Sequence, residues 1–263
     1  MGTKLNLLAS TAMASCVVVW LDPAMAGNVP SPFSWTGCYV GLNAGGLSAR
    51  IAHNVVVPAV AGGPGELDIG DSGSGTGFIG GGQAGCNQQY FGNWVFGIEG
   101  DLDYARTSHN FNSNFDASPY NLGFEDAYGP ATISAQASLH WLATFRGRVG
   151  YSVWDRTFIF ATGGIAIGSV SASLDGSVSS TLGPFLFAGS YSGVRTGWVL
   201  GAGVEHAFTD SITAKLEYLH FDLGDVSYVV IGSNGGGTLP TTWNANASFS
   251  GDLVRVGLNF KIP

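Results

Sequence analysis

The sequence predicts an all-β fold: an eight-stranded antiparallel up-and-down transmembrane β-barrel that follows a cleaved signal peptide. The final segment, 252–262, alternates between apolar residues on one parity and mostly polar residues on the other, as a two-faced strand does. Only 11% of the 263 residues are charged, against about 25% in soluble proteins. Short and long connections alternate along the chain, as they do in barrels that cross a membrane with strands. Together these observations favour a barrel whose apolar face points outward.

The N-terminus has the features of an export signal. Lys4, an apolar stretch over 5–21 and an Ala-x-Ala site at 24–26 are typical of a secretory signal peptide, so we expect residues 1–26 to be removed. A membrane anchor is the alternative, but the stretch is short and interrupted by Ser and Thr. Residues 27–34 then form a short Pro-bearing lead-in, and 35–263 form the barrel domain.

The mature chain divides into eight strand-like segments, each longer than the ~9 to 11 residues that cross a bilayer at a tilt. Three connections between them are tight, near 91–93, 153–156 and 208–211. Four are long and rich in Gly, Ser, Asn or Pro, near 48–75, 106–134, 169–193 and 224–248, and we expect them to be loops on the outer side. The predicted strands are 35–47, 76–90, 94–105, 135–152, 157–168, 194–207, 212–223 and 249–262.

Most charged residues in these strands fall on the parity opposite to the aromatic and aliphatic residues. In the fourth strand, for example, Leu139, Trp141 and Phe145 share one face, and Arg146 and Arg148 share the other. A basic residue at the lipid midplane costs about 2–4 kcal/mol, so we expect the charges to line the lumen and to pair there. The predicted network has five acids and four bases: Glu99, Asp101, Asp103, Glu205 and Glu217 with Arg146, Arg148, Lys215 and Arg255.

Eight strands enclose a space that side chains can fill, so we expect a plugged lumen and no open pore. Inward glycines would make room for the long Arg and Glu side chains, and we assign this role to positions 41, 85, 97, 147 or its neighbours, 201, 203 and 257. Aromatic residues close to the tight turns suit a girdle at the periplasmic interface. These are Trp35, Trp94, Trp154, Phe208 and Phe260.

Two cysteines remain after signal removal, Cys38 and Cys86. An even count in an exported protein favours a disulfide. Parity directs both side chains outward on adjacent antiparallel strands, near the periplasmic end, so we expect a cross-strand bridge there. A metal site would need more ligands than two thiols with no neighbouring His or Cys-x-x-Cys motif.

Several motifs resemble a known family. They include Trp35-Thr-Gly-Cys-Tyr-Val-Gly, Val95-Phe-Gly-Ile-Glu-Gly-Asp-Leu, Arg146-Gly-Arg-Val-Gly-Tyr and Gly197-Trp-Val-Leu-Gly-Ala-Gly-Val-Glu. The chain resembles the small outer-membrane β-barrel family of Gram-negative bacteria, of the opacity-protein and OmpA-barrel type often labelled "porin family". The resemblance covers all eight strands in order and implies residence in the cell outer membrane, among its lipid and lipopolysaccharide, as a monomer.

The closing segment resembles the C-terminal signal that the barrel-assembly machinery reads. The matching residues are Arg255, Gly257, Phe260 and Ile262, although the chain continues to Pro263 where most family members stop at an aromatic residue. The barrel-assembly machinery is therefore an expected partner during biogenesis. The resemblance also permits a host or small-molecule ligand at the surface loops.

Other functional classes fit the sequence less well. A formal net charge of −8 with no basic stripe argues against nucleic acid as a partner. Residues 80–85 satisfy G-x-G-x-x-G, but within a strand, so we expect no dinucleotide and no other cofactor. An outer-leaflet lipid-modifying enzyme is conceivable because His220, Asp222 and Ser250 fall at the outer ends of two strands. No third group or oxyanion donor accompanies them, so a non-enzymatic role is favoured.

The sequence therefore predicts a structural outer-membrane barrel that supports envelope integrity and displays surface loops for binding or adhesion. The first alternative is a small-solute porin, and a lipid-modifying enzyme is the less favoured one.

Overall fold

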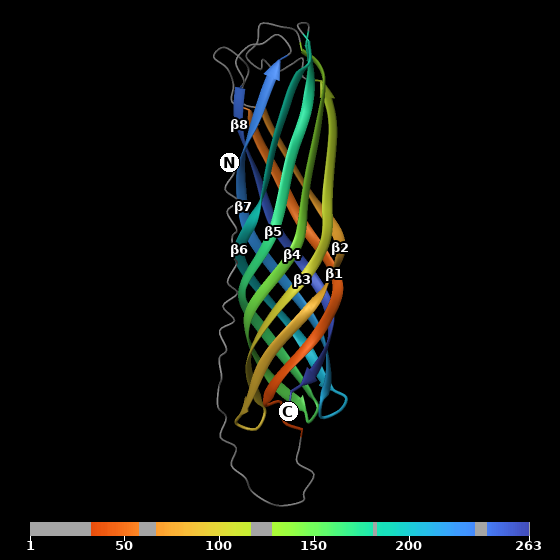
Figure 1. The fold of residues 1–263 in the computed structure, drawn as a ribbon, viewed down its shortest axis with the longest axis vertical. Coiled ribbons are helices and arrows are strands. Elements are labelled where there is room, and N and C mark those ends of the chain that lie inside the picture. The colour runs from red at the N-terminus through yellow and green to blue at the C-terminus, as the bar shows by residue number, and fades with distance from the viewer. Residues whose placement is uncertain (1–32, 58–66, 117–127, 181–182, 235–240, 263) are drawn as a thin grey trace, which may run out of the picture. The chain divides into compact units, whose positions relative to one another are not determined.

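In the computed structural model, residues 33–57, 67–116, 128–180, 183–234 and 241–262 can be described. These residues form eight antiparallel strands in one closed barrel, in which each strand pairs with the next in sequence and β1 pairs with β8 (Figure 1). No helix in the described part is long and apolar enough to cross a membrane. The predicted signal peptide, 1–26, lies outside the described residues. The strands are β1 Gly37–Val57, β2 Leu67–Tyr90, β3 Trp94–Asp116, β4 Tyr128–Trp154, β5 Thr157–Ser180, β6 Phe185–Ala207, β7 Ile212–Asn234 and β8 Thr241–Lys261.

The three tight connections are confirmed. Strand β2 turns into β3 at 91–93, where Phe91 and Gly92 have positive φ angles of 51° and 80°. Glycine suits the second of these positions because it adopts the left-handed region without a steric cost. The turns after β4 and β6 span 155–156 and 208–211. The tight turns gather at one end of the barrel, where the C-terminus also lies (Figure 1).

The four long loops were predicted wrongly. Strands of 21 to 27 residues run through most of the segments assigned to them, so the barrel is about twice as long as a membrane crossing needs. The abundance of Gly, Ser and Asn there suggested loops, but these residues alternate with apolar ones. In β5, for example, the serines at 169, 171 and 173 alternate with Val170, Ala172 and Leu174.

Strand β8 shows how the two halves of the barrel differ. Toward the tight turns its outward side chains are Val254, Val256, Leu258 and Phe260, all substantially exposed. Toward the other end its outward positions carry Asn244, Asn246, Ser248, Ser250 and Asp252. The inward positions change in the opposite sense, from Asn259 and Arg255 to Leu253, Phe249 and Ala247. The polarity of the strand therefore inverts between residues 252 and 254.

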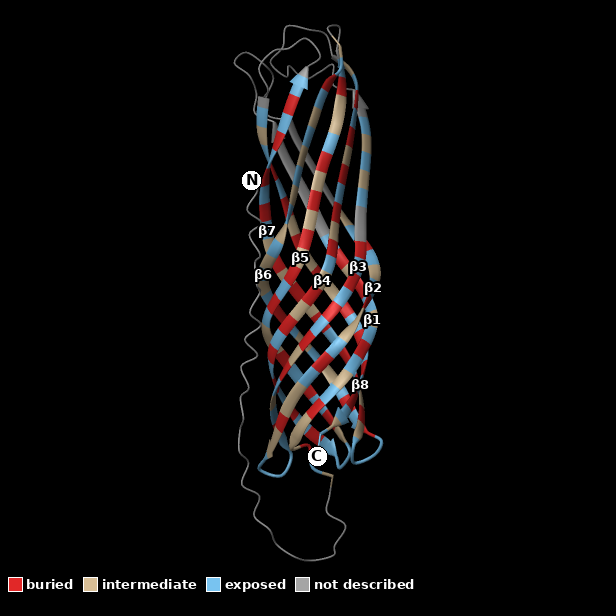
Figure 2. Cartoon of the chain, in the orientation of Figure 1, coloured by how far each residue is buried: buried red, intermediate tan, exposed pale blue. Residues whose placement is uncertain are grey.

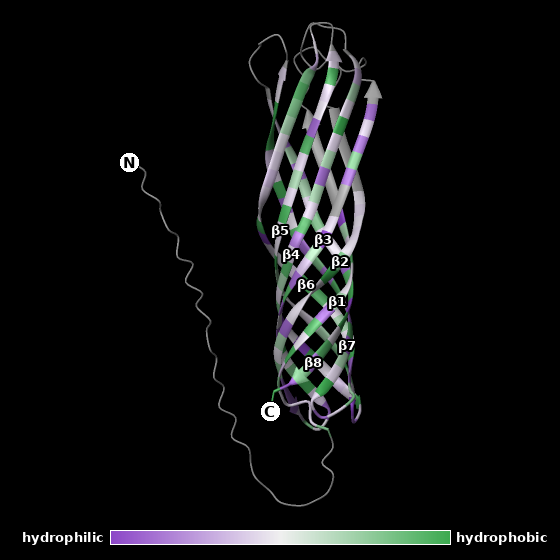
Figure 3. Cartoon of the chain, turned by 45° about the vertical axis from the view of Figure 1, so that its right-hand side comes forward, coloured by the Kyte–Doolittle hydropathy of each residue, from purple (hydrophilic) through white to green (hydrophobic). Residues whose placement is uncertain are grey.

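The same inversion occurs in other strands. Outward residues change from Tyr104 to Arg106 in β3 and from Ile167 to Ser169 in β5. Buried and exposed positions alternate along the full length of most strands, and apolar residues occur on both sides of the boundary (Figures 2 and 3). We call the half near the tight turns the lipid-facing half, and the half beyond the boundary the outer half.

Two irregularities exchange the inward and outward parities at this boundary. The β4–β5 register shifts between Leu139 and Trp141, so Leu139 points inward, opposite to the prediction, and His140 points outward. The β7–β8 register shifts between Asp222 and Asp225, with Gly224 at a φ of +73°. Extra residues of this kind are β-bulges, which re-aim every later side chain in the strand.

The barrel interior consists of three layers. A small apolar cluster next to the tight turns contains Trp35, Val95, Phe158, Phe160 and Ala207. Buried charged and polar residues occupy the middle of the lipid-facing half. A larger apolar core fills the outer half. Its members closest to the charges are Leu47, Ile79, Ala105, Leu142, Leu219 and Leu253.

Candidate functional site

The predicted disulfide is present. Cys38 of β1 and Cys86 of β2 lie directly opposite each other in the strand register, with their Cα atoms 4.0 Å apart. Both positions point outward in the lipid-facing half, as parity indicated. The bridge therefore links the first two strands near the end of the barrel that carries the tight turns.

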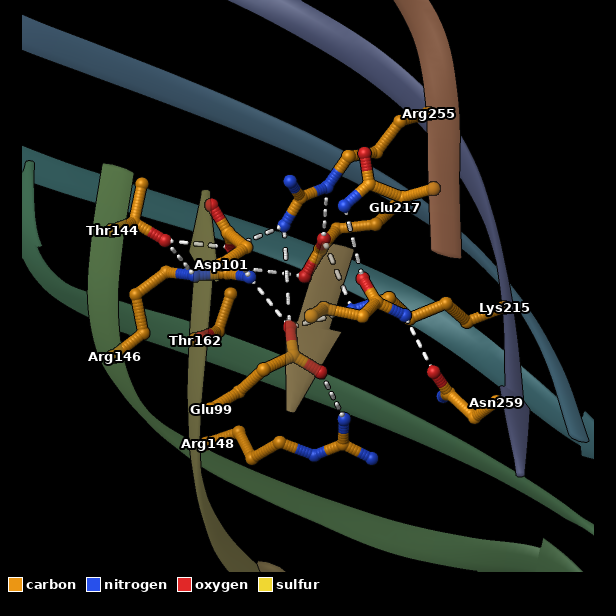
Figure 4. A network of polar contacts seen from close by, with 12 residues as sticks. Glu99, Asp101, Thr144, Arg146, Arg148, Thr162, Lys215, Glu217, Arg255 and Asn259 are labelled. Atoms are coloured by element: carbon orange, nitrogen blue, oxygen red, sulfur yellow. Dashed lines mark hydrogen bonds and ion pairs between the residues drawn. The ribbon is translucent and has the colours of Figure 1, made fainter. Parts of the chain in front are cut away.

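All nine predicted lumen charges lie inside the barrel. Arg146 of β4 contacts three carboxylates from two other strands (Figure 4). Its Nη2 atom is 2.5 Å from Glu99 Oε1 and 2.8 Å from Asp101 Oδ2, both on β3. Its Nη1 atom is 2.7 Å from Glu217 Oε1 on β7. One guanidinium thus joins strands from opposite sides of the barrel.

Arg255 makes a second bridge. Its Nε donates to Glu217 Oε2 at 2.9 Å, and its two terminal nitrogens donate to Asp101 and Asp103 at 2.7 and 2.6 Å. Strand β8 is thereby connected to β7 and β3 through the lumen. Because the Arg255 side chain is fully buried, water cannot replace these contacts.

The remaining charges extend the network toward the tight turns. Arg148 donates to Glu99 at 3.1 Å and to Glu205 at 2.6 Å, and its guanidinium lies over the rings of Phe158 and Phe160 at 4.9 and 4.7 Å. Lys215 contacts Glu99 at 2.5 Å. The charged layer therefore adjoins the aromatic cluster through a cation–π contact.

Neutral polar residues that the sequence prediction left out complete the network. Thr144 donates to Asp101 at 2.8 Å, and the Tyr39 hydroxyl donates to Glu99 at 2.5 Å. Thr213 and Asn259 both donate to Glu205 Oε1. Their inward parity was visible in the sequence, but no charge marked them as members.

The network lies between two apolar layers. One inward position beyond Asp103, Thr144, Glu217 and Arg255, the inward residues are Ala105, Leu142, Leu219 and Leu253, each at most 2% exposed. On the other side lies the cluster around Trp35. The described side chains therefore fill the lumen of the lipid-facing half.

Two assignments near this site need correction. Trp35 is 2% exposed and packs against Phe158 with ring centroids 4.3 Å apart, so it belongs to the lumen plug and not to the girdle. The chain before β1 turns inward, and parity could not reveal this. Gly147 points outward, whereas its neighbours Arg146 and Arg148 point inward. The other girdle residues, Trp94, Trp154, Phe208 and Phe260, are exposed near the tight turns.

A second polar cluster faces outward at the polarity boundary. Asp252 accepts hydrogen bonds from the Tyr218 hydroxyl at 2.6 Å and from His220 Nδ1 at 2.8 Å, and Arg50 lies 3.7 Å away. These hydrogen bonds, that of Tyr218 first, lower the pKa of Asp252 below its ordinary value. Of the residues considered for an enzyme, Ser250 lies opposite Asp222, and Asp222 accepts from the Gly224 amide at 2.7 Å. The structure thus pairs His220 with Asp252 and assigns Asp222 to a bulge.

Comparison with known proteins identifies the family. The family model of the outer membrane protein beta-barrel domain matches residues 23–250. The chain belongs to this family. The 31 kDa outer-membrane immunogenic protein of Brucella melitensis biotype 1 is 31% identical over 265 residues, which cover 97% of this chain and 95% of the relative. The 22 kDa outer membrane protein of Rhizobium leguminosarum bv. viciae is 35% identical over 170 residues, or 64% of each chain.

Solved structures of other outer-membrane barrels also align with the chain. The outer membrane protease OmpT from Escherichia coli aligns over 86% of this chain and 97% of its own, with a TM-score of 0.46 and 9% identity. Family membership makes this an outer-membrane β-barrel protein. The tight turns therefore lie on the periplasmic side, and the outer half of the barrel projects from the cell.

Proposed function

We propose that this barrel is a structural protein of the outer membrane, which supports envelope integrity and presents its outer half for binding or adhesion. The filled lumen carries the proposal. A buried charge network between two apolar layers offers no described path for solute, and it ties β3, β4, β7 and β8 together across the barrel. A rigid, plugged barrel suits a role in envelope integrity better than a role in transport.

The length of the strands supports the display role. Apolar side chains are exposed on the outward face of the outer half, at Leu186 of β6 and at Val229 and Ile231 of β7, each more than half exposed. Exposed apolar groups of this kind on a water-facing surface favour contact with a partner. We take this face as the candidate for adhesion.

The two roles can be separated in a strain that lacks the gene. Wild type should restore both detergent resistance and surface binding. The double variant Val229→Ser, Ile231→Ser should restore detergent resistance alone, because both positions lie beyond the lipid-facing half. Failure of wild type to restore detergent resistance would contradict the structural role, and unchanged binding by the double variant would remove this face as the adhesion surface. Large steady conductance steps of the purified protein in a planar bilayer would favour the porin alternative.

We also propose that the barrel-assembly machinery reads the C-terminal end of β8. Phe260 and Ile262 point outward near the periplasmic end, each about half exposed, where a partner can reach them. Replacing Phe260 with Ala should lower the amount of folded protein in the outer membrane several-fold. Phe208→Ala, at an exposed turn position, is the matched control. Equal yields from the two variants would contradict the signal.

A further inference from the structure

A shallow groove of about 620 Å³ lies on the lipid-facing surface of β2, β3 and β4, directly below the polarity boundary. Gly80, Gly81 and Asp103 line its floor, and the outward side chains of Leu102, Tyr104 and Trp141 flank it. The Asp103 side chain is buried and paired with Arg255 in the lumen network. A Cβ atom at position 80 would come within 3.1 Å of the Phe78 ring. Because Gly80 lies on the outward face and lines the groove, a larger side chain at this position would project into it.

Arg106 stands at the outer end of this groove. It is the next outward residue of β3 after Tyr104, about 7 Å farther along the strand, and it lies opposite Phe78 of β2. Its side chain is exposed, and no ion pair or side-chain hydrogen bond to it occurs among the described residues. A cation thus adjoins an apolar groove at the level where lipid headgroups meet acyl chains.

The other cations of the protein have different surroundings. Arg50 is near Asp252, and Arg195 donates to the Asp225 carbonyl at 2.6 Å. Beyond the boundary, segments 51–75, 107–140, 169–194 and 223–251 contain no Lys or Arg. Four bases belong to the lumen network, and the periplasmic rim carries Arg156 and Lys261. Arg106 therefore differs from the other described cations in having an apolar groove beside it and no protein acceptor.

We propose that Arg106 and this groove form a binding site for a phosphorylated glycolipid of the outer leaflet, the lipid A part of lipopolysaccharide. The Arg106 guanidinium binds a headgroup phosphate, for which its planar fork of donors is suited. One acyl chain lies in the groove over Gly80 and Gly81. Tyr104 and Trp141 hold the boundary between headgroup and chain, where amphipathic rings are favoured.

Native mass spectrometry of the purified full-length barrel in detergent tests this site. The probes are bisphosphorylated lipid A and the same lipid without its phosphates. Wild type should retain one phosphorylated lipid far better than the dephosphorylated one. Arg106→Gln should lower retention of the phosphorylated lipid about tenfold, the equivalent of losing about 1.4 kcal/mol. The dephosphorylated lipid should bind wild type and this variant equally.

Matched variants distinguish binding of the lipid headgroup from binding of its acyl chain. They also distinguish binding at this site from non-specific attraction to positive charge. Gly80→Leu fills the groove and should weaken both probes. Gly147→Leu, on the outward face of β4 away from the groove and with nothing within 4 Å of a Cβ, should weaken neither. Arg156→Gln removes a cation at the opposite rim and should leave retention unchanged. Undiminished retention by Arg106→Gln, or an equal loss in Arg156→Gln, would overturn the proposal. If Gly80→Leu fails to fold, as heat-dependent gel mobility would show, Arg106→Gln decides alone.

Discussion

The lipid-facing half and the outer half of this barrel are built from the same eight strands with opposite polarity. In the lipid-facing half, charges fill the lumen and Val, Leu and Phe cover the surface. In the outer half, Ala, Val, Leu and Phe fill the interior, and Ser, Asn and Thr cover much of the surface. The backbone pairing of β1 with β2, of β1 with β8 and of β5 with β6 continues without a register shift across the change. The difference shows that the solvent outside a barrel, and not its topology, decides which parity is apolar.

Each half must satisfy a different condition. In the lipid-facing half, buried charges must find partners in the lumen because the lipid side offers none. In the outer half, water solvates the polar surface and the hydrophobic effect favours a dry interior. The boundary between them, marked by Asp252 on β8 and Arg106 on β3, is where the expected bilayer surface lies.

Breaking the lumen network should have the largest effect. Replacing Arg255 with Met leaves Asp101, Asp103 and Glu217 without one of their bases in a site that water does not reach. We expect the free energy of unfolding to fall by about 3–5 kcal/mol, the typical cost of breaking a buried ion pair. Urea unfolding of the barrel reconstituted in lipid vesicles measures it. Arg156→Met, which breaks the exposed pair with Asp210, should cost less than about 1 kcal/mol. Equal losses would mean that the network is solvated.

Truncating apolar side chains on either side of the boundary should give a smaller contrast. Leu174 of β5 points into the outer core and is 3% exposed, whereas Ile165 of the same strand faces lipid and is 51% exposed. Leu174→Ala should cost about 2–5 kcal/mol, as for other buried leucines. Ile165→Ala should cost much less, since only part of its side chain is packed. The same unfolding assay compares them, and a reversed order would contradict the assignment of the two faces.

Tyr228 should give the smallest effect. It is buried in the outer core, and its hydroxyl has no partner among the described residues, so Tyr228→Phe should stabilise the barrel by about 1 kcal/mol. Burial raises the pKa of Tyr228 to about 12 from an ordinary value of 10.0. Burial disfavours the phenolate in the barrel, so the barrel keeps its full stability below pH 10 and loses stability as the pH rises toward 12. Wild type should lose more stability than Tyr228→Phe over this range, and parallel pH curves would refute the shift.

Much of the lipid-facing half could be predicted from sequence. The alternation of residues along the strands correctly assigned all nine lumen charges to the inward face and both cysteines to the outward face. The charges could be assigned because lipid offers a charged side chain no solvation. The outer half was missed because the strands were identified by an apolar outer face. In segments such as 169–174, serines alternate with apolar residues, as polar and apolar residues do in strands of soluble proteins. This alternation is visible in the sequence. The bulges at His140 and Gly224 could not be predicted, since one extra residue leaves no mark in composition.

Two arginine substitutions on the same face of β8 test the inversion of polarity between residues 252 and 254 most directly. Val256 and Asn246 both point outward, ten positions apart, on either side of the boundary. Val256→Arg should lower the free energy of unfolding in lipid vesicles by about 2–4 kcal/mol, the cost of a basic residue deep in the bilayer. Asn246→Arg should change it by less than about 0.5 kcal/mol, because water surrounds that position. Similar losses from both variants would show that the outer half also lies in lipid, and would contradict the division of this barrel into two halves.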